Sequence, residues 1–189
     1  MAQSWGNKIS SIFNLLGQLE FTDGKGGPLD REAAFSKLNK LTLDIRSKHK
    51  TVYVIGNGAS ASMASHFAAD MAKNGKLHTQ VFSDLALITA ISNDLGYKEV
   101  FAEPLRRRGR KGDMLVAISS SGMSENIIEA VKIANALEMD IVTLSAMKED
   151  NLLRGLGRLN AYLPAKTYGD AETVHAAFLH FWIDLIVEN

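Results

Sequence analysis

Hydrophobic residues in the first part of the chain recur at intervals of three and four, the spacing of an amphipathic helix. Two such stretches occur, one at residues 7–20 and one after Asp30, a residue type that favours the N-cap position. The glycine-rich segment 21–28 between them predicts a loop. We therefore expect an N-terminal helical hairpin within residues 1–50. Because the two helices lack a core of their own, they must pack on the rest of the chain or on another subunit.

From Thr51 onward, short apolar runs alternate with helical patterns, as in parallel sheets that are covered by helices on both faces. The predicted strands are residues 51–55, 79–82, 114–118, 141–144 and 159–163, and the predicted helices are 59–73, 85–92, 99–108, 124–137 and 171–187. The pattern predicts an α/β fold, a three-layer α/β/α sandwich with a mostly parallel, flavodoxin-like sheet. We expect one domain over residues 1–189, with the α/β core at 51–189.

The last predicted helix is apolar on nearly all sides. Such a helix is normally buried on most of its surface. In a chain of 189 residues, part of that surface is expected to lie at a subunit interface.

Composition narrows the functional classes. Hydrophobic residues make up 46% and charged residues 22%, which excludes a disordered chain. The net charge is zero, so we expect neither nucleic acid nor a membrane surface as partner. The chain has no cysteine, which excludes disulfides, thiolate metal sites and a cysteine nucleophile. No secretory signal is visible in residues 1–5, and no apolar run reaches the roughly 20 residues of a membrane helix. We expect a cytoplasmic protein.

Two hydroxyl-rich loops follow predicted strands and open predicted helices. They are Gly56-Asn57-Gly58-Ala59-Ser60-Ala61-Ser62 and Ser119-Ser120-Ser121-Gly122-Met123-Ser124-Glu125-Asn126. Hydroxyl groups and the N–H groups of a helix N-terminus bind phosphate without a lysine. Either loop alone could be an ordinary turn. Ligands of open α/β sheets bind at the carboxyl edge of the strands, so the pair predicts an anion site there.

The first loop also fits the pattern G-x-G-x-x-A of dinucleotide-binding folds. Such folds place an acidic residue about 20 residues further on, and the nearest candidate, Asp84, comes too late. A nicotinamide dehydrogenase is thus an alternative that rests on this pattern alone.

The order G-N-G-x-S-A, followed about 60 residues later by S-x-S-G-x-S, resembles the SIS (sugar isomerase) domain. His66-Phe67-Ala68, Asn93-Asp94 and the histidines of the last helix resemble the phosphoheptose isomerases in particular. The resemblance covers residues 51–188. It implies an aldose–ketose isomerase of heptose biosynthesis, which converts sedoheptulose 7-phosphate through an enediol(ate), and a homotetramer. The alternative is a phosphosugar-binding regulator or adaptor without catalytic activity, but the first-helix carboxylate and His180 are present and favour the enzyme.

Several titratable residues have a spacing that suits a site. His66 and Asp70 are four residues apart and share a helix face. Glu172 and His180 are eight apart and lie roughly 80° from each other around a helix, so both could face one cleft. Taken singly, each histidine is also explained by a structural role. His175 lies off this stripe and is expected to be a packing or capping residue.

The resemblance assigns roles to these four residues. Zinc-binding phosphoheptose isomerases use a histidine and a glutamate on the first helix with a glutamine and a histidine on the last, which match His66, Asp70, Glu172 and His180. Asp70 and Glu172 are departures from that pattern. The resemblance implies a Zn²⁺ site at these residues, Asp70 or Glu172 as the base, and His180 as metal ligand or partner acid.

The resemblance also assigns the substrate contacts. The residues expected to bind substrate are Asn57, Gly58, Ser60, Asn93, Asp94, Ser119, Ser120, Ser121 and Ser124. The serines would hold the phosphate, and Asp94 would accept hydrogen bonds from the sugar hydroxyls.

Overall fold

The computed structural model describes residues 4–188; residues 1–3 and Asn189, which the single predicted domain includes, lie outside it. The described residues form a seven-stranded sheet in the order β2-β1-β7-β6-β5-β3-β4. The strands are β1 (Glu20–Asp23), β2 (Pro28–Leu29), β3 (Thr51–Gly56), β4 (His78–Gln80), β5 (Met114–Ser119), β6 (Asp140–Ala146) and β7 (Leu159–Leu163). Strands β3 to β7 pair in parallel and form the 2-1-3-4-5 order of flavodoxin-like folds, which confirms the predicted sheet.

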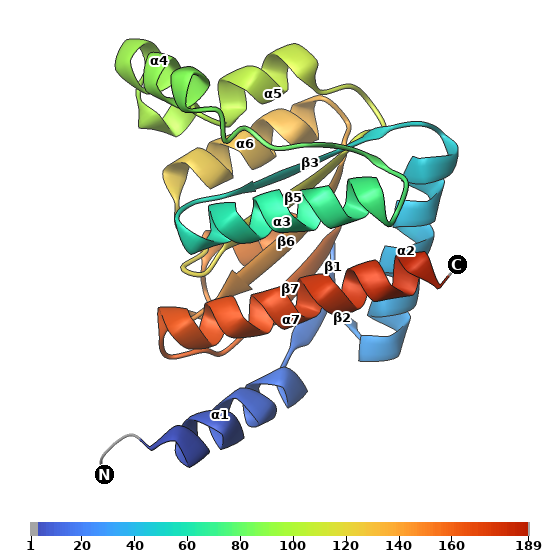
Figure 1. Cartoon of the computed structure of the whole chain (residues 1–189), viewed down its shortest axis with the longest axis vertical. Coiled ribbons are helices and arrows are strands. Elements are labelled where there is room, and N and C mark those ends of the chain that lie inside the picture. Colours follow the sequence, from blue (N-terminus) through green and yellow to red (C-terminus); the bar gives the residue numbers. More distant parts are fainter. Residues whose placement is uncertain (1–3, 189) are drawn as a thin grey trace.

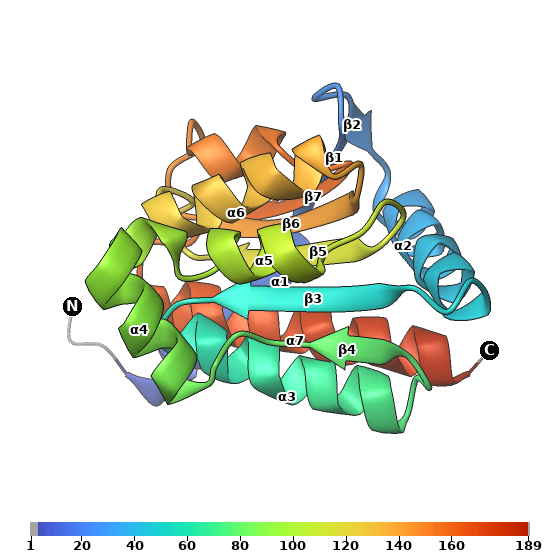
Figure 2. The same ribbon diagram turned by 90° about the horizontal axis from the view of Figure 1, so that it is seen from above.

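Helices cover both faces of this sheet (Figures 1 and 2). The helices are α1 (Trp5–Gly17), α2 (Arg31–Ser47), α3 (Ala59–Lys73), α4 (Leu85–Leu95), α5 (Ala102–Arg108), α6 (Glu125–Ala136) and α7 (Tyr168–Val187), with short 3₁₀ turns η1 (Tyr97–Glu99) and η2 (Leu152–Gly155). Figure 2 shows α3 and α7 below the sheet and α5 and α6 above it. The predicted three-layer sandwich is confirmed. None of the helices within residues 4–188 combines the length and the apolar character needed to cross a membrane.

The central strands explain why two layers of helices are needed. All six residues of β5 are buried. Val116 and Ile118 join the core on the α3 and α7 side, whereas Leu115 and Ala117 join the core on the α6 side. Each large apolar side chain removed from water stabilises the fold by about 1.5–3 kcal/mol, so both faces must be covered.

The prediction of a plain loop at residues 21–28 is wrong. Strands β1 and β2 form a hairpin there, and β1 pairs antiparallel with the edge strand β7. Phe21 is buried, with its ring centroid 5.2 Å from that of Phe35 and 6.0 Å from that of Phe178. This aromatic cluster holds β1 on the sheet although the strand is too short to show a periodic pattern. The two N-terminal helices are therefore connected through the sheet.

Several other boundaries differ from the sequence prediction, such as the end of α4 at Leu95 and the start of α7 at Tyr168. The helix expected at 99–108 is divided into η1 and α5, and the strand expected at 79–82 ends at Gln80. Glycine and proline explain the division into η1 and α5, since Gly96 has φ +91° before η1 and Pro104 fits only the first turn of a new helix.

Helix α7 finds much of its cover inside the chain. It packs against α1, α2 and α3. Trp182 is fully buried, and its Nε1 donates a hydrogen bond of 3.0 Å to Thr42 Oγ1 on α2. Phe181 stays 45% exposed. Helices of the same chain therefore cover most of the apolar surface of α7. A subunit interface at this helix stays a prediction.

His175 is a packing residue, as predicted. Its side chain is buried between α7 and the sheet, with Nε2 3.4 Å from the Ser145 carbonyl oxygen and with no hydrogen-bond partner for Nδ1 among the described residues. Burial lowers the pKa of His175 from 6.5 to about 4. Between these two values the unfolded chain binds a proton that the folded chain does not bind.

Folding stability should therefore fall as the pH drops through this window. The contribution of neutral His175 is complete above about pH 6.5 and decreases toward pH 4, with a loss of about 2 kcal/mol at pH 5. Urea unfolding at pH 7.5 and pH 5 measures this difference in the free energy of unfolding. His175→Gln should remove most of the difference, and the exposed His78→Gln should not. An equal pH dependence in His175→Gln and in the unchanged protein would contradict the assignment.

Candidate functional site

The two serine loops meet at the carboxyl ends of neighbouring strands. β3 and β5 are parallel partners, with Gly56 opposite Ile118. The chain leaves β3 toward β4 on one side and returns to β5 on the other, so this is the switch point at which open α/β sheets bind ligands. A hollow of about 300 Å³ opens between the loops. Its lining comes from residues 57–60, from residues 118–121 with Ser124, and from Tyr168 and Glu172 of α7.

The first loop depends on close backbone approach. A Cβ atom on Gly56 would lie 2.6 Å from the carbonyl carbon and oxygen of Ser60, so a side chain at this position would push the start of α3 away. Gly58 has φ +56°, a conformation that favours glycine. The tight turn buries Ser60 and directs the N-terminus of α3 to the hollow, where its partial positive charge favours an anion.

The second loop organises its own hydroxyl groups. Ser119 Oγ accepts a hydrogen bond of 3.2 Å from the Gly122 N–H and lies 3.3 Å from Ser124 Oγ. Ser120 differs, because its buried Oγ has no hydrogen-bond partner among the described residues. A buried hydroxyl left unpaired costs about 1–3 kcal/mol. Since Ser120 lines the hollow, an acceptor such as a phosphate oxygen would satisfy it.

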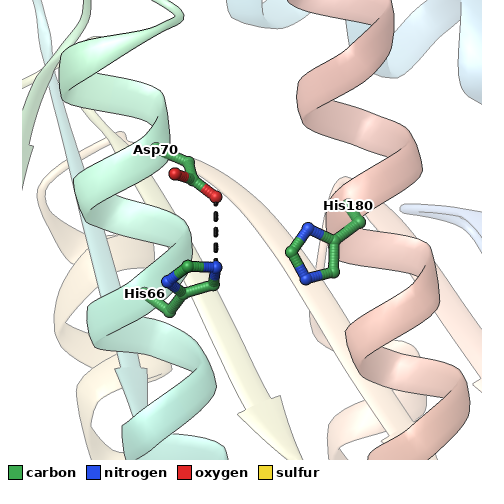
Figure 3. A group of neighbouring side chains, drawn as sticks. All are labelled: His66, Asp70 and His180. Carbon is green, nitrogen blue, oxygen red and sulfur yellow. Dashed lines mark ion pairs between the residues drawn. The ribbon is translucent and has the colours of Figure 1, made fainter.

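A second hollow of about 260 Å³ lies between the next turns of α3 and α7. Figure 3 shows His66 and Asp70 on α3 facing His180 on α7. His66 Nε2 lies 3.3 Å from Asp70 Oδ2, and the ring centroids of the two histidines are 5.4 Å apart. One ligand atom from each of the three residues lies within 4.8 Å of the others. We call these three residues the His–Asp–His triad.

The triad fits a divalent transition metal by its chemistry. Two imidazole nitrogens and one carboxylate oxygen are donors that Zn²⁺ uses in catalytic sites, where three protein ligands leave a position open for substrate. The site is accessible, because the His66 side chain is 64% and the Asp70 side chain 24% exposed. The donor set alone does not select zinc over other metals of this class.

Glu172 does not join the triad and lines the serine hollow instead. The reason is the rise of the helix. Eight residues separate Glu172 from His180, which corresponds to about 12 Å along α7 at 1.5 Å per residue. The angle between the two residues permits both to face one side of the helix, but the rise places them in neighbouring hollows.

The structure does not bring Asn93 and Asp94 to either hollow. They lie exposed at the end of α4, where Asn93 Nδ2 donates to Asp94 Oδ1 at 2.8 Å. Helix α4 buries none of its residues. The contact of Asp94 with the sugar stays a prediction.

Three residues at the site had no predicted role. Tyr168 lines the serine hollow, Asn126 pairs with Asn57, and the Tyr97 hydroxyl donates to Asn57 Oδ1 at 3.1 Å. No short motif marks the two tyrosines. Asn126 is the last residue of the second serine loop, but its partner is 69 residues away.

Comparisons with known proteins agree with this geometry. A family model described as the SIS domain matches residues 30–146. The phosphoheptose isomerase of Helicobacter pylori is 32% identical over 152 residues, which cover 77% of this chain and 79% of that protein.

Two solved structures are similar over nearly the whole chain. The phosphoheptose isomerase from Francisella tularensis has a TM-score of 0.80 at 26% identity and covers 99% of this chain and 100% of its own. The phosphoheptose isomerase from Neisseria gonorrhoeae has a TM-score of 0.81 at 28% identity and covers 96% and 94%.

Proposed function

The chain belongs to the SIS domain family and, within it, to the phosphoheptose isomerases, and from this premise we propose that it interconverts sedoheptulose 7-phosphate and an aldoheptose 7-phosphate. It is an isomerase, and its substrate class is the phosphosugars. One observation carries the proposal: a hollow with an unpaired buried serine hydroxyl adjoins the His–Asp–His triad along the same two helices.

The arrangement of the two hollows suits a long sugar chain. Ser60 and His66 are six residues apart on α3, about 9 Å along its axis. A phosphate in the serine hollow would thus leave the far end of an extended sugar beside the triad. The hydroxyl groups of Ser60, Ser119, Ser120, Ser121 and Ser124 would donate to the phosphate oxygens, together with the N–H groups of the loop at Asn57 and Gly58.

Side chains of the two hollows would move the proton, Asp70 and His180 from the second hollow and Glu172 from the serine hollow. The carboxylate of Asp70 or Glu172 takes a proton from carbon 1 of the ketose, and the freed electron pair forms the carbon 1–carbon 2 double bond of an enediol as the oxygen on carbon 2 gains a proton. Return of a proton to carbon 2, with loss of the proton on the carbon 1 hydroxyl, gives the aldose. His180 would supply the acid or hold a metal. A divalent ion such as Zn²⁺, held by His66, Asp70 and His180, would act as a Lewis acid toward the carbonyl oxygen.

The two departures from the family pattern predict unequal effects of substitution. Glu172→Gln should lower kcat on the order of 100-fold if Glu172 is the base, because it removes the carboxylate that α7 contributes to the serine hollow. Asp70→Glu should be neutral or better, since it restores one methylene of reach. Steady-state kinetics of the two variants give the comparison. Full activity in Glu172→Gln would exclude it as the base and leave Asp70.

We propose a homotetramer because the chain leaves apolar helix faces uncovered. On α1, Trp5 is 78% and Phe13 76% exposed, with the exposed Ile9 between them at helical spacing. Helix α4 is largely apolar, with Leu85 74% exposed. Closed symmetric assemblies bury such faces. Light scattering at micromolar concentration should give four times the chain mass of 20.6 kDa. A monomeric mass would contradict the tetramer.

Turnover of a defined set of substrates tests the proposed function. Purified protein should convert sedoheptulose 7-phosphate to an aldose phosphate, faster with added zinc than after chelation. It should convert fructose 6-phosphate more slowly, because a shorter chain cannot reach the triad from the serine hollow. Tight binding of sedoheptulose 7-phosphate without any product would instead favour the phosphosugar-binding regulator.

A further inference from the structure

Two asparagine side chains join the serine loops directly. Asn57 Nδ2 donates to Asn126 Oδ1 at 2.9 Å, and Asn126 Nδ2 donates back to Asn57 Oδ1 at 2.9 Å. Asn57 lies in the first serine loop, and Asn126 ends the second loop, in the first turn of α6. We call this reciprocal contact the Asn57–Asn126 clasp. It connects the carboxyl ends of β3 and β5 across the rim of the serine hollow.

Neighbouring groups fix the orientation of both carboxamides. Asn126 Oδ1 also accepts a hydrogen bond of 3.0 Å from the backbone N–H of Ile127, which can only donate. That contact identifies the oxygen of Asn126, and the reciprocal pairing then identifies the oxygen of Asn57. The Tyr97 hydroxyl donates to Asn57 Oδ1 from η1. Both carboxamide oxygens therefore accept two hydrogen bonds each, which leaves the Asn57 oxygen engaged with protein groups.

The burial of the clasp makes it rigid. Asn126 is 2% exposed, and a buried carboxamide is stable only with its hydrogen bonds made. Loss of either asparagine side chain would leave the other without its hydrogen bonds. The clasp therefore keeps the two serine loops at a fixed distance from each other. This separation decides whether the hydroxyl groups of Ser60 on one loop and Ser120 on the other reach the same phosphate.

We propose that Asn126 is a positioning residue for phosphate binding and acts through Asn57. The clasp holds the serine loops at the distance at which both contact one phosphate, and Tyr97 secures Asn57 from the side of η1. This inference rests on the proposed phosphate site and concerns the order of its loops, not the isomerisation step.

Binding of inorganic phosphate by titration calorimetry tests the clasp without recourse to activity. Asn126→Ala and Asn57→Ala should each weaken phosphate about tenfold. The double variant should lose no more than either single variant, because both break the same contact. Asn135→Ala is the matched control, an exposed asparagine on the same helix, and should bind phosphate as the unchanged protein does. In steady-state kinetics, the clasp variants should raise KM and leave kcat within about twofold.

The outcomes separate the clasp from the phosphate site. If the unchanged protein binds phosphate and both clasp variants bind it equally well, the clasp inference fails and the site stands. If the unchanged protein does not bind phosphate, both fail. Additive losses in the double variant would also overturn the clasp. If Asn126→Ala does not fold, the test uses Asn57→Ala and Tyr97→Phe, because Asn57 is in a partly exposed loop and Tyr97 in an exposed turn. Both folded variants should then bind phosphate more weakly than the unchanged protein.

Discussion

Replacing His180 with asparagine should lower kcat on the order of 10³-fold while sugar-phosphate affinity changes little. The imidazole faces His66 across the second hollow, and in the proposed mechanism it either supplies the acid or holds the metal. Asparagine is shorter and does not titrate, so it replaces neither role. Steady-state turnover gives the loss in kcat, and zinc titration calorimetry shows whether the lost role was metal binding.

A control with the same substitution separates the site from general effects. His49 is exposed and lines neither hollow, and asparagine tolerates its positive φ of 52°. His49→Asn should keep full activity. Turnover retained by His180→Asn would exclude the triad as the reacting centre.

Gly122→Ala should have the largest effect on the serine hollow. A Cβ atom at this position would lie 1.9 Å from Asn151 Oδ1, and the glycine has φ +63°. Asn151 cannot turn away freely, because its Nδ2 donates to the Lys148 carbonyl at 2.7 Å and its Oδ1 accepts from the Arg154 N–H at 3.1 Å. Strain and overlap together should lower the free energy of unfolding by about 3 kcal/mol or more. The folded fraction should also lose phosphate affinity, because the loop is displaced.

The neighbouring Gly155 provides the matched control. A Cβ atom there would meet nothing within 4 Å, and the glycine has no positive φ. Gly155→Ala should change the unfolding free energy by less than about 0.5 kcal/mol. Urea unfolding and phosphate calorimetry on both variants give the comparison. Equal stability of Gly122→Ala and the unchanged protein would show that the loop does not need glycine at this position.

Those parts of the fold that depend on local pattern could be predicted from the sequence. Buried strands such as β5 are continuous apolar runs, and the serine loops follow them directly. Because parallel strands end at one edge, the meeting of the loops followed from their place in the chain. His66 and Asp70 were predicted neighbours because four residues make about one turn of a helix.

Features that depend on distant contacts could not be predicted. Strand β1 is held by pairing with β7 and by Phe21 in an aromatic cluster, and neither contact leaves a periodic signal in four residues. The Asn57–Asn126 clasp joins residues 69 positions apart. The resemblance groups Glu172 with His66, Asp70 and His180, and its angle on the helix permits this, but the rise along α7 places Glu172 beside the serines.

Conversion of sedoheptulose 7-phosphate in deuterated water, followed by nuclear magnetic resonance, tests the central claim most directly. The proposed proton transfer predicts an aldose 7-phosphate that carries deuterium from the solvent at carbon 2, at a rate that falls on the order of 10³-fold in His180→Asn. Titration calorimetry with the same protein should show that it binds sedoheptulose 7-phosphate and that this binding depends on the serine loops. Tight binding with neither product nor deuterium incorporation would contradict isomerisation and leave a phosphosugar-binding protein.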